Sequence, residues 1–142
     1  MIGFEIKRMF FDRQAVISKV DAATRRVLSR FGAFVRRSAK SSIRKRKKAA
    51  PPGQPPSSHT GLLKKFIFFG YDADRRSVVI GPTRLNQKGR GEAPPLLEYG
   101  GKATLVRRGK KKRVTYQARP YMGPAFEKEK PQLPAMWRGS VR

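Results

Sequence analysis

Residues 13 to 47 contain no proline and a single glycine, Gly32, and this run constrains the fold more than any other part of the chain. Apolar residues recur in it at spacings of three or four, which places them on one face of a helix. They are Val16, Val20, Ala23, Val27, Phe31 and Phe34, flanked by Ile17, Thr24, Leu28 and Val35. Asp12 stands directly before the run and is a suitable N-cap. We therefore predict one long amphipathic helix from Arg13 to about Lys47.

The next segment, residues 49–60, has the opposite character. It holds one glycine and four prolines, which are Pro51, Pro52, Pro55 and Pro56. Proline lacks a backbone donor and fixes φ, so this composition excludes a helix or a central strand. We expect an extended Pro-rich loop or arm.

Two pairs of short runs predict β-hairpins. In the first pair, Leu62–Phe69 and Ser77–Ile80 flank a polar connection at residues 71–76. In the second pair, Ala103–Arg107 and Arg113–Gln117 flank a strongly basic tip, residues 107–113. At the N-terminus, Ile2, Phe4 and Ile6 alternate with Gly3, Glu5 and Lys7, which predicts one more short strand.

The remaining segments complete the expected fold. Residues 83–95 are polar and glycine-rich and predict a loop, and residues 96–99 predict one helical turn that ends at Gly100 and Gly101. Pro124 suits the first position of a short helix over residues 125–130. Residues 138–142 are expected to form a flexible tail.

Together these elements predict a single α+β domain that spans residues 1–142. Its long N-terminal amphipathic helix is expected to pack on one antiparallel β-sheet of about four or five strands, with a short C-terminal helix. No apolar run approaches the roughly 20 residues that a membrane span requires, so no membrane partner is expected.

The charge is extreme for a chain of this size. Thirty-four lysines and arginines stand against nine acidic residues, for a formal net charge of +25. So large a charge favours a partner that is a polyanion or an acidic protein surface. Two runs concentrate it, at residues 44–48 and 107–113. The residues expected to contact nucleic acid or an acidic partner are Arg44, Lys45, Arg46, Lys47, Lys48, Arg107, Arg108, Lys110, Lys111, Lys112 and Arg113.

Each basic run also has a simpler interpretation. Cations in the last turn of a helix complement its dipole by about 0.3–1 kcal/mol each, and lysines on a strand protect an exposed sheet edge from aggregation. These interpretations explain the positions of the charges and leave their number unexplained. Non-specific contact with double-stranded DNA and contact with acidic protein partners both remain open, whereas no motif for base-specific recognition is present.

The residues that would be needed for catalysis are scarce. His59 is the only histidine and lies in the Pro-rich segment, and there is no cysteine. The acidic pairs Asp72/Asp74 and Glu127/Glu129 have a spacing that does not bring carboxylates to one point on a helix. The glycines near Gly81 do not form a phosphate-binding loop. We therefore expect no enzyme activity, no catalytic residue, no cofactor and no metal site.

Three short segments, taken in order, resemble the tail-completion or head–tail joining proteins of long-tailed phages, a neck family that includes minor tail proteins. The first is His59-Thr60-Gly61-Leu62-Leu63-Lys64-Lys65, which follows the long helix and the Pro-rich segment. The second is Pro95-Leu96-Leu97-Glu98-Tyr99-Gly100-Gly101, and the third is Ala118-Arg119-Pro120-Tyr121-Met122-Gly123-Pro124-Ala125-Phe126.

The resemblance implies a virion structural protein that completes the tail and joins it to the head, located at the head–tail junction and in the host cytoplasm during assembly. It implies a homo-oligomeric ring, expected to be six-fold, around the DNA channel, with connector and tail-terminator or tail-tube proteins as neighbours. The Pro-rich arm would then become ordered on an adjacent subunit. The residues expected at subunit or partner interfaces are Pro51, Pro52, Pro55, Pro56, Thr60, Gly61, Glu98, Arg119, Tyr121 and Met122.

Several roles are expected for single residues of these segments. Glu98 is expected to pair with an arginine, and Arg119 to make an ion pair or to donate to backbone carbonyls. Tyr121, Met122 and Phe126 are expected to lie in the core or at a subunit interface. The alternative hypothesis for the whole chain is a free nucleic-acid-binding protein of the ribosomal or nucleoid kind, and an endolysin-type enzyme is disfavoured.

Overall fold

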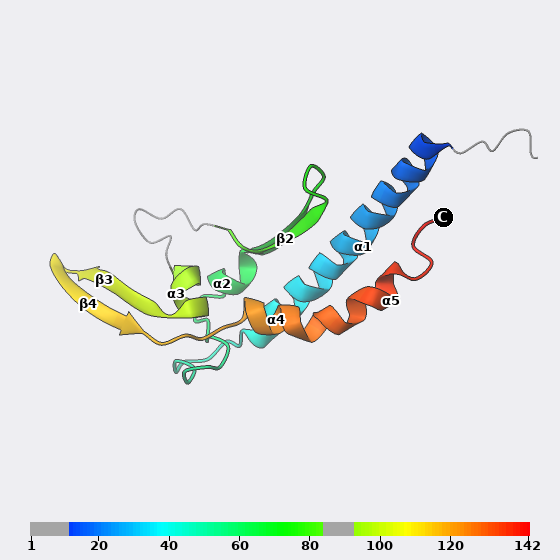
Figure 1. Ribbon diagram of the computed structural model, residues 1–142. Coiled ribbons are helices and arrows are strands. Elements are labelled where there is room, and N and C mark those ends of the chain that lie inside the picture. The colour runs from blue at the N-terminus through cyan, green and yellow to red at the C-terminus, as the bar shows by residue number, and fades with distance from the viewer. Residues whose placement is uncertain (1–11, 84–92) are drawn as a thin grey trace, which may run out of the picture.

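The computed structural model describes residues 12–83 and 93–142, and in these residues the chain has the expected α+β class (Figure 1). The long helix α1 spans Arg13–Ser42 and is followed by the short α2, Leu62–Lys65, and the strands β1, Ile67–Asp72, and β2, Ser77–Pro82. After α3, Ala93–Tyr99, come β3, Gly101–Arg107, and β4, Lys110–Tyr116. The chain ends with α4, Met122–Glu129, a 3-10 turn over Lys130–Gln132, and α5, Leu133–Trp137.

Helix α1 begins as predicted and ends earlier than predicted. The Asp12 carboxylate accepts a hydrogen bond from the Ala15 N–H at 3.0 Å, as expected for an N-cap. The helix ends at Ser42 instead of continuing to about Lys47, and Ile43 is extended and buried in the core. Near this end the Ser41 and Ser42 hydroxyls donate to backbone carbonyls of the helix itself, which weakens helical preference. The basic run at residues 44–48 therefore follows the helix and does not form its last turn.

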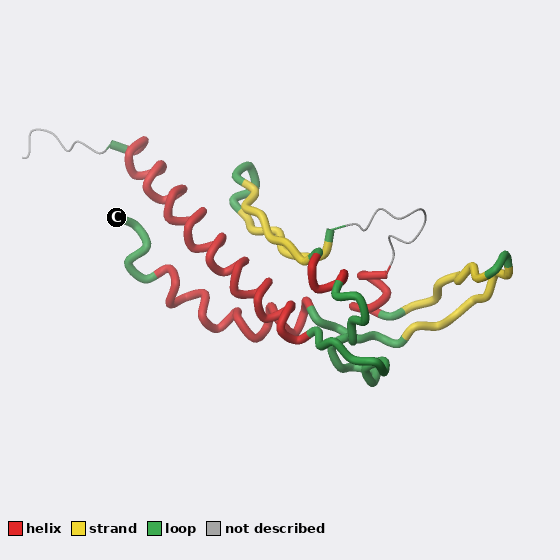
Figure 2. Tube along the Cα trace, turned by 180° about the vertical axis from the view of Figure 1, so that it is seen from behind, coloured by secondary structure: helices red, strands yellow, loops and turns green. Residues whose placement is uncertain are grey.

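The strands form two separate sheets in the described residues, where one sheet of four or five strands was predicted. β1 pairs with β2 and β3 pairs with β4, both antiparallel. The first hairpin packs against α1, whereas the second extends away from it (Figures 1 and 2). The second hairpin carries basic side chains on both faces, and burying such charges without partners is costly, so it cannot join a sheet that packs on a core.

The other predicted boundaries are corrected in three places. The run predicted as a strand from Leu62 begins with the helical turn α2, and the strand starts at Ile67. Helix α3 starts at Ala93, so residues 93–95 of the predicted loop are helical. Near the C-terminus, which was expected to be a flexible tail, the Ser140 carbonyl accepts a hydrogen bond from Arg26 of α1 at 2.8 Å. The predicted N-terminal strand at Ile2, Phe4 and Ile6 lies outside the described residues, as does most of the loop at 83–95.

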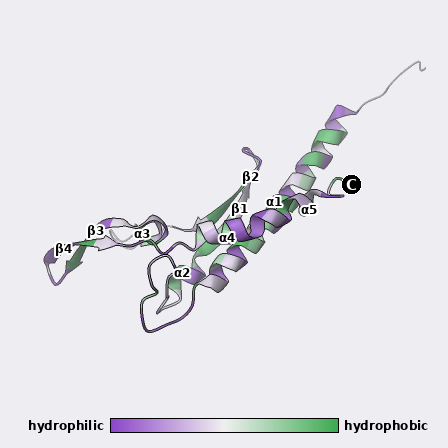
Figure 3. Ribbon diagram, turned by 60° about the horizontal axis from the view of Figure 1, so that its bottom comes forward, coloured by the Kyte–Doolittle hydropathy of each residue, from purple (hydrophilic) through white to green (hydrophobic). Residues whose placement is uncertain are grey.

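The core lies between α1, β1 and α4, and Figure 3 shows how apolar and polar residues alternate around α1. Its buried members are Phe31, Val35, Ala39, Ile43, Ile67, Tyr121 and Ala125. The predicted apolar stripe on α1 is longer than the surface that packs on it, since Val16 and Val20 remain 43% and 42% exposed. None of the helices in the described residues combines the length and apolar character that crossing a membrane would require.

Gly32 marks the closest approach of the first hairpin to α1. A Cβ atom at this position would lie 2.7 Å from Val78 Cγ2 and 2.9 Å from Phe69 Cδ2. Both distances are shorter than van der Waals contact, so the absence of a side chain permits the hairpin to pack here. The glycine that lowers helix propensity in the sequence thus has a packing role.

Gly32→Ala is expected to lower the free energy of unfolding by about 1–2 kcal/mol. Overpacking costs roughly 1–3 kcal/mol, and alanine recovers at most about 1 kcal/mol of helix propensity. Urea denaturation measures the change. Ser18→Ala, at an exposed position of the same helix, is the control and should change stability by less than about 0.5 kcal/mol. A more stable Gly32→Ala variant would contradict the close approach.

Candidate subunit and nucleic-acid interface

The strands β3 and β4 form a projecting two-stranded hairpin, residues 101–116, which we call the basic ribbon (Figure 1). It contains seven lysines and arginines and no acidic residue. Arg108 and Gly109 have φ angles of 51° and 76° and form its two-residue turn, as is typical of tight hairpins. The predicted basic tip, residues 107–113, therefore lies at the outer end of the ribbon, and its side chains are exposed.

The strand register sorts the ribbon residues into two faces. Ala103 pairs with Val114 and Leu105 with Lys112 on one face, whereas Val106 pairs with Lys111 on the other. Leu105 is 47% exposed and Val106 is 62% exposed. An isolated two-stranded hairpin is at best marginally stable in water. A ribbon of this kind is therefore suited to lie against a surface supplied by another molecule.

Glu98, in the last turn of α3, caps the N-terminus of α4. Its Oε2 accepts hydrogen bonds from the N–H groups of Tyr121 and Met122, both at 3.0 Å, and its Oε1 accepts one from the Gly123 N–H at 2.7 Å. A carboxylate at this position satisfies donors that a helix leaves free and complements the helix dipole. The partners of Glu98 are thus backbone amides and not the arginine that was predicted.

Two glycines permit the close packing around this cap. A Cβ on Gly123 would lie 3.1 Å from Glu98 Oε1. Gly100 has a φ of 72°, and a Cβ there would lie 2.9 Å from the Tyr116 carbonyl oxygen at the root of the ribbon. The second and third motifs, residues 95–101 and 118–126, therefore form one structural unit, in which α3, the ribbon root and α4 meet.

Arg119 connects the Pro-rich loop to this unit. Its Nε donates to the Ala50 carbonyl at 2.7 Å, and its backbone N–H donates to the Leu97 carbonyl at 2.6 Å. Arg119 was expected either to form an ion pair or to donate to backbone carbonyls, and the structure shows the second role. In addition, the Gly53 N–H donates to the Ala118 carbonyl at 2.8 Å.

The Pro-rich loop consequently packs against the rest of its own chain and does not extend as a free arm. Ala50, Pro56 and Ser58 are buried, whereas Pro51 and Pro52 are exposed and Pro55 is half-buried. The loop closes with the Ser58 Oγ, which accepts from the Gly61 N–H at 2.9 Å. Thr60 and Gly61, the latter with a φ of 77°, lead the chain into α2 instead of directly into a strand.

Tyr121 is a core residue in this chain, only 1% exposed, and Met122 packs half-buried beside the core. Phe126 makes an edge-to-face contact with Phe31, with ring centroids 5.7 Å apart, and is 40% exposed. Within the described residues, the Tyr121 hydroxyl is buried and has no hydrogen-bond partner. Burial, and secondarily the nearby charge of Glu98, raises the pKa of Tyr121 to about 12.

Tyr121→Phe is expected to leave stability at neutral pH unchanged or to raise it by up to about 1 kcal/mol, because it removes an unsatisfied buried hydroxyl. The folded chain keeps this tyrosine neutral to a higher pH than the unfolded chain, whose tyrosines ionise near their ordinary pKa of about 10. Its contribution to stability is therefore lost as the pH rises from about 10 through about 12. Urea midpoints measured across this range should fall more steeply for the wild type than for Tyr121→Phe, and parallel curves would contradict the assignment.

The acidic residues of the described part serve mainly as caps and ion-pair partners. Asp21 pairs with Arg76 at 3.1 Å, and the Asp72 carboxylate accepts from the N–H groups of the turn that joins β1 and β2. Glu129 is buried and accepts from the Ser38 hydroxyl and from Gln132. Nowhere in residues 12–83 and 93–142 do three His, Cys, Asp or Glu side chains gather as a metal site.

The two basic runs are both exposed and belong to different elements. Residues 44–48 lie in the segment after α1, where the Arg44 carbonyl accepts from the Ser58 N–H at 3.0 Å. Residues 107–113 lie at the ribbon tip. The Pro-rich loop, bonded to Ala118 and Arg119 beside the ribbon root, connects the two regions.

Comparison with known protein families, with curated proteins and with solved structures finds no match for this chain. The resemblance of the three motifs to neck proteins therefore stays a hypothesis.

Proposed function

We propose that this chain is a virion structural protein of a tailed phage, which assembles as a ring at the head–tail junction and joins the tail to the head. Its neighbours would be connector and tail-terminator or tail-tube proteins, and the DNA channel would pass through the ring. During assembly the protein would be in the host cytoplasm.

The observation that carries this proposal is the basic ribbon, which leaves the body of the subunit and exposes both of its faces. Ala103, Leu105 and Val114 share one face toward the root and supply an apolar contact for a neighbouring subunit. The tip supplies an uncompensated positive charge for DNA in the channel. A ring of such subunits would multiply a weak, sequence-independent contact with phosphate.

The second and third motifs support the proposal in a second way. They are separated in sequence, yet their residues form a connected unit through the Glu98 cap and the hydrogen bond from the Arg119 N–H to the Leu97 carbonyl. Motifs that stabilise the same structural unit are expected to occur together. Their occurrence in the same order as in neck proteins therefore counts as one combined feature in favour of the resemblance.

The alternative is a free nucleic-acid-binding protein of the ribosomal or nucleoid kind. The same ribbon favours it, because the major groove of duplex DNA admits a two-stranded β-ribbon. The two proposals differ in assembly. The neck protein is expected to form a closed ring with itself or with its neighbours, whereas the alternative would bind DNA as a monomer.

The decisive experiment is disruption of the gene in the phage that encodes it, followed by electron microscopy of the lysate. The neck proposal expects DNA-filled heads and separate tails, restored to whole particles by the wild-type gene supplied in trans. Normal joining without the protein would overturn the proposal. A purified monomer that binds duplex DNA and forms no ring with neighbouring gene products would favour the alternative.

A further inference from the structure

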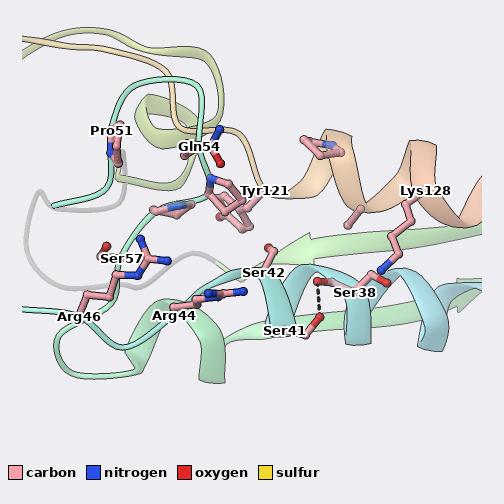
Figure 4. Close-up of a pocket in the computed structure, with 14 residues that line it drawn as sticks. Ser38, Ser41, Ser42, Arg44, Arg46, Pro51, Gln54, Ser57, Tyr121 and Lys128 are labelled. Atoms are coloured by element: carbon pink, nitrogen blue, oxygen red, sulfur yellow. Dashed lines mark hydrogen bonds between the residues drawn. The ribbon is translucent and has the colours of Figure 1, made fainter. Parts of the chain in front are cut away.

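We propose that the recess between the end of α1, the Pro-rich loop and the start of α4 holds a phosphate group of duplex DNA. The recess has a volume of about 590 Å³ (Figure 4). Its wall includes Arg44 and Arg46 from the segment after α1 and Lys128 from α4. The inference rests on the proposed function to the extent that it places DNA beside the basic ribbon.

Three cations line the recess without an acidic neighbour among its lining residues. Within the described residues, none of the three takes part in an ion pair. Two groups disfavour an anion here: the carbonyl end of α1, with roughly half an elementary negative charge, and the Glu129 carboxylate, which accepts a hydrogen bond from the lining residue Ser38. The three positive charges outweigh both. A guanidinium group presents its donors in a fork that matches two phosphate oxygens.

The wall adds neutral donors and a rigid frame. Gln54 and Ser57 line the recess from the Pro-rich loop and supply these donors, while the buried Tyr121 forms part of the wall at the start of α4. Pro51, Pro55 and Pro56 also belong to the wall. Because proline has a fixed φ, little backbone freedom remains to be lost when a ligand binds.

The position of the recess favours DNA over an acidic protein segment. The loop that forms one wall is bonded to the ribbon root, through Gly53 to Ala118 and through Arg119 to Ala50. The recess is therefore joined by hydrogen bonds to the root of the basic ribbon. A duplex that lies on the ribbon can present further backbone phosphates to the recess. A single carboxylate side chain would need only one of the three cations on the wall.

The test measures binding of the full-length protein to a short fluorescent DNA duplex as a function of salt. Arg44→Gln/Arg46→Gln is expected to weaken binding by roughly tenfold and to reduce the magnitude of the slope of log K against log salt by about 0.9, the value for one neutralised phosphate. The control, Arg13→Gln/Lys19→Gln, removes the same charge from exposed positions in the first half of α1. It should leave the slope unchanged.

A second pair of variants tests the recess without removing a cation. Ser41→Glu places a carboxylate at an exposed position on the recess wall and should weaken binding as much as the arginine variant. Ser18→Glu adds the same charge at an exposed position near the opposite, N-terminal end of α1 and should weaken DNA binding much less. Urea midpoints close to that of the wild type establish that each variant is folded.

Two results would overturn the inference. One is an equal loss of DNA affinity in the recess variants and their controls. The other is unchanged DNA binding together with lost binding of a polyglutamate peptide, which would assign the recess to an acidic protein partner. The proposed function is tested separately. Normal head–tail joining after gene disruption would overturn the proposed function without changing the DNA-binding results for the purified protein.

Discussion

Glu98→Ala is expected to lower the free energy of unfolding by about 3 kcal/mol, because hydrogen bonds to a charged group each contribute roughly 1.5–3 kcal/mol and three backbone donors lose their acceptor. Helix α4 would lose its cap, and with it the register in which Tyr121 and Ala125 enter the core. Glu98→Gln should cost less, about 1–2 kcal/mol, since one amide oxygen can still accept while the charge is lost. Urea denaturation followed by circular dichroism measures both changes.

Glu127→Gln is the matched control, because it removes the same charge from α4, the helix that Glu98 caps. Glu127 pairs with Lys130 at 3.7 Å, and the two side chains are 67% and 59% exposed. An exposed pair of this kind contributes at most about 1 kcal/mol. If Glu98→Ala destabilises the protein no more than Glu127→Gln does, the capping role of Glu98 is wrong.

Replacing Lys110, Lys111 and Lys112 together with glutamine removes three phosphate contacts and is expected to weaken binding to non-specific duplex DNA by roughly two to three orders of magnitude at low salt. The magnitude of the slope of log K against log salt should fall by up to about 2.7, at about 0.9 for each phosphate that the variant no longer neutralises. The three side chains are exposed at the ribbon tip, so stability should change little. Fluorescence anisotropy at several salt concentrations measures both quantities.

The control for the ribbon variant removes three charges elsewhere. Arg13, Lys19 and Arg25 are exposed on the first half of α1, and their replacement with glutamine lowers the net charge by the same amount. Equal losses of affinity in both variants would mean that net charge alone attracts DNA and that the ribbon has no special part. Unchanged DNA binding by the ribbon variant, together with failure to join heads and tails, would assign the tip to an acidic neighbour.

Local pattern was sufficient to predict α1 from its N-cap to Ser42 and the existence of both hairpins, although not the end of the helix. The Asp12 cap joins two residues that are three positions apart, and the apolar residues of α1 recur every three or four positions. Both patterns can therefore be recognised within a single turn of helix. A hairpin likewise needs only its turn and its two flanking runs. Each of these predictions depends on contacts between residues close in sequence.

The predicted sheet and the predicted partner of Glu98 failed for the opposite reason. Whether four strands form one sheet or two depends on which strand surfaces are buried. The basic ribbon stays separate because it has charged side chains on both faces, and this distribution is visible only once the strand register is known. Glu98 and the amides that it caps are 23–25 residues apart. No local spacing relates a carboxylate in one helix to the first N–H groups of another.

The sequence by itself determined the positive charge, the scarcity of catalytic groups, and the long helix with two hairpins, because composition and short-range periodicity are properties of the chain. Only the tertiary structure decided that the Pro-rich loop folds onto the rest of its own chain and that Glu98 caps α4. It also decided that Arg44 and Arg46 line a recess with Lys128, more than 80 residues further along the chain. These contacts join distant segments, and their free energy comes from burial and hydrogen bonds that exist only once the segments have packed together.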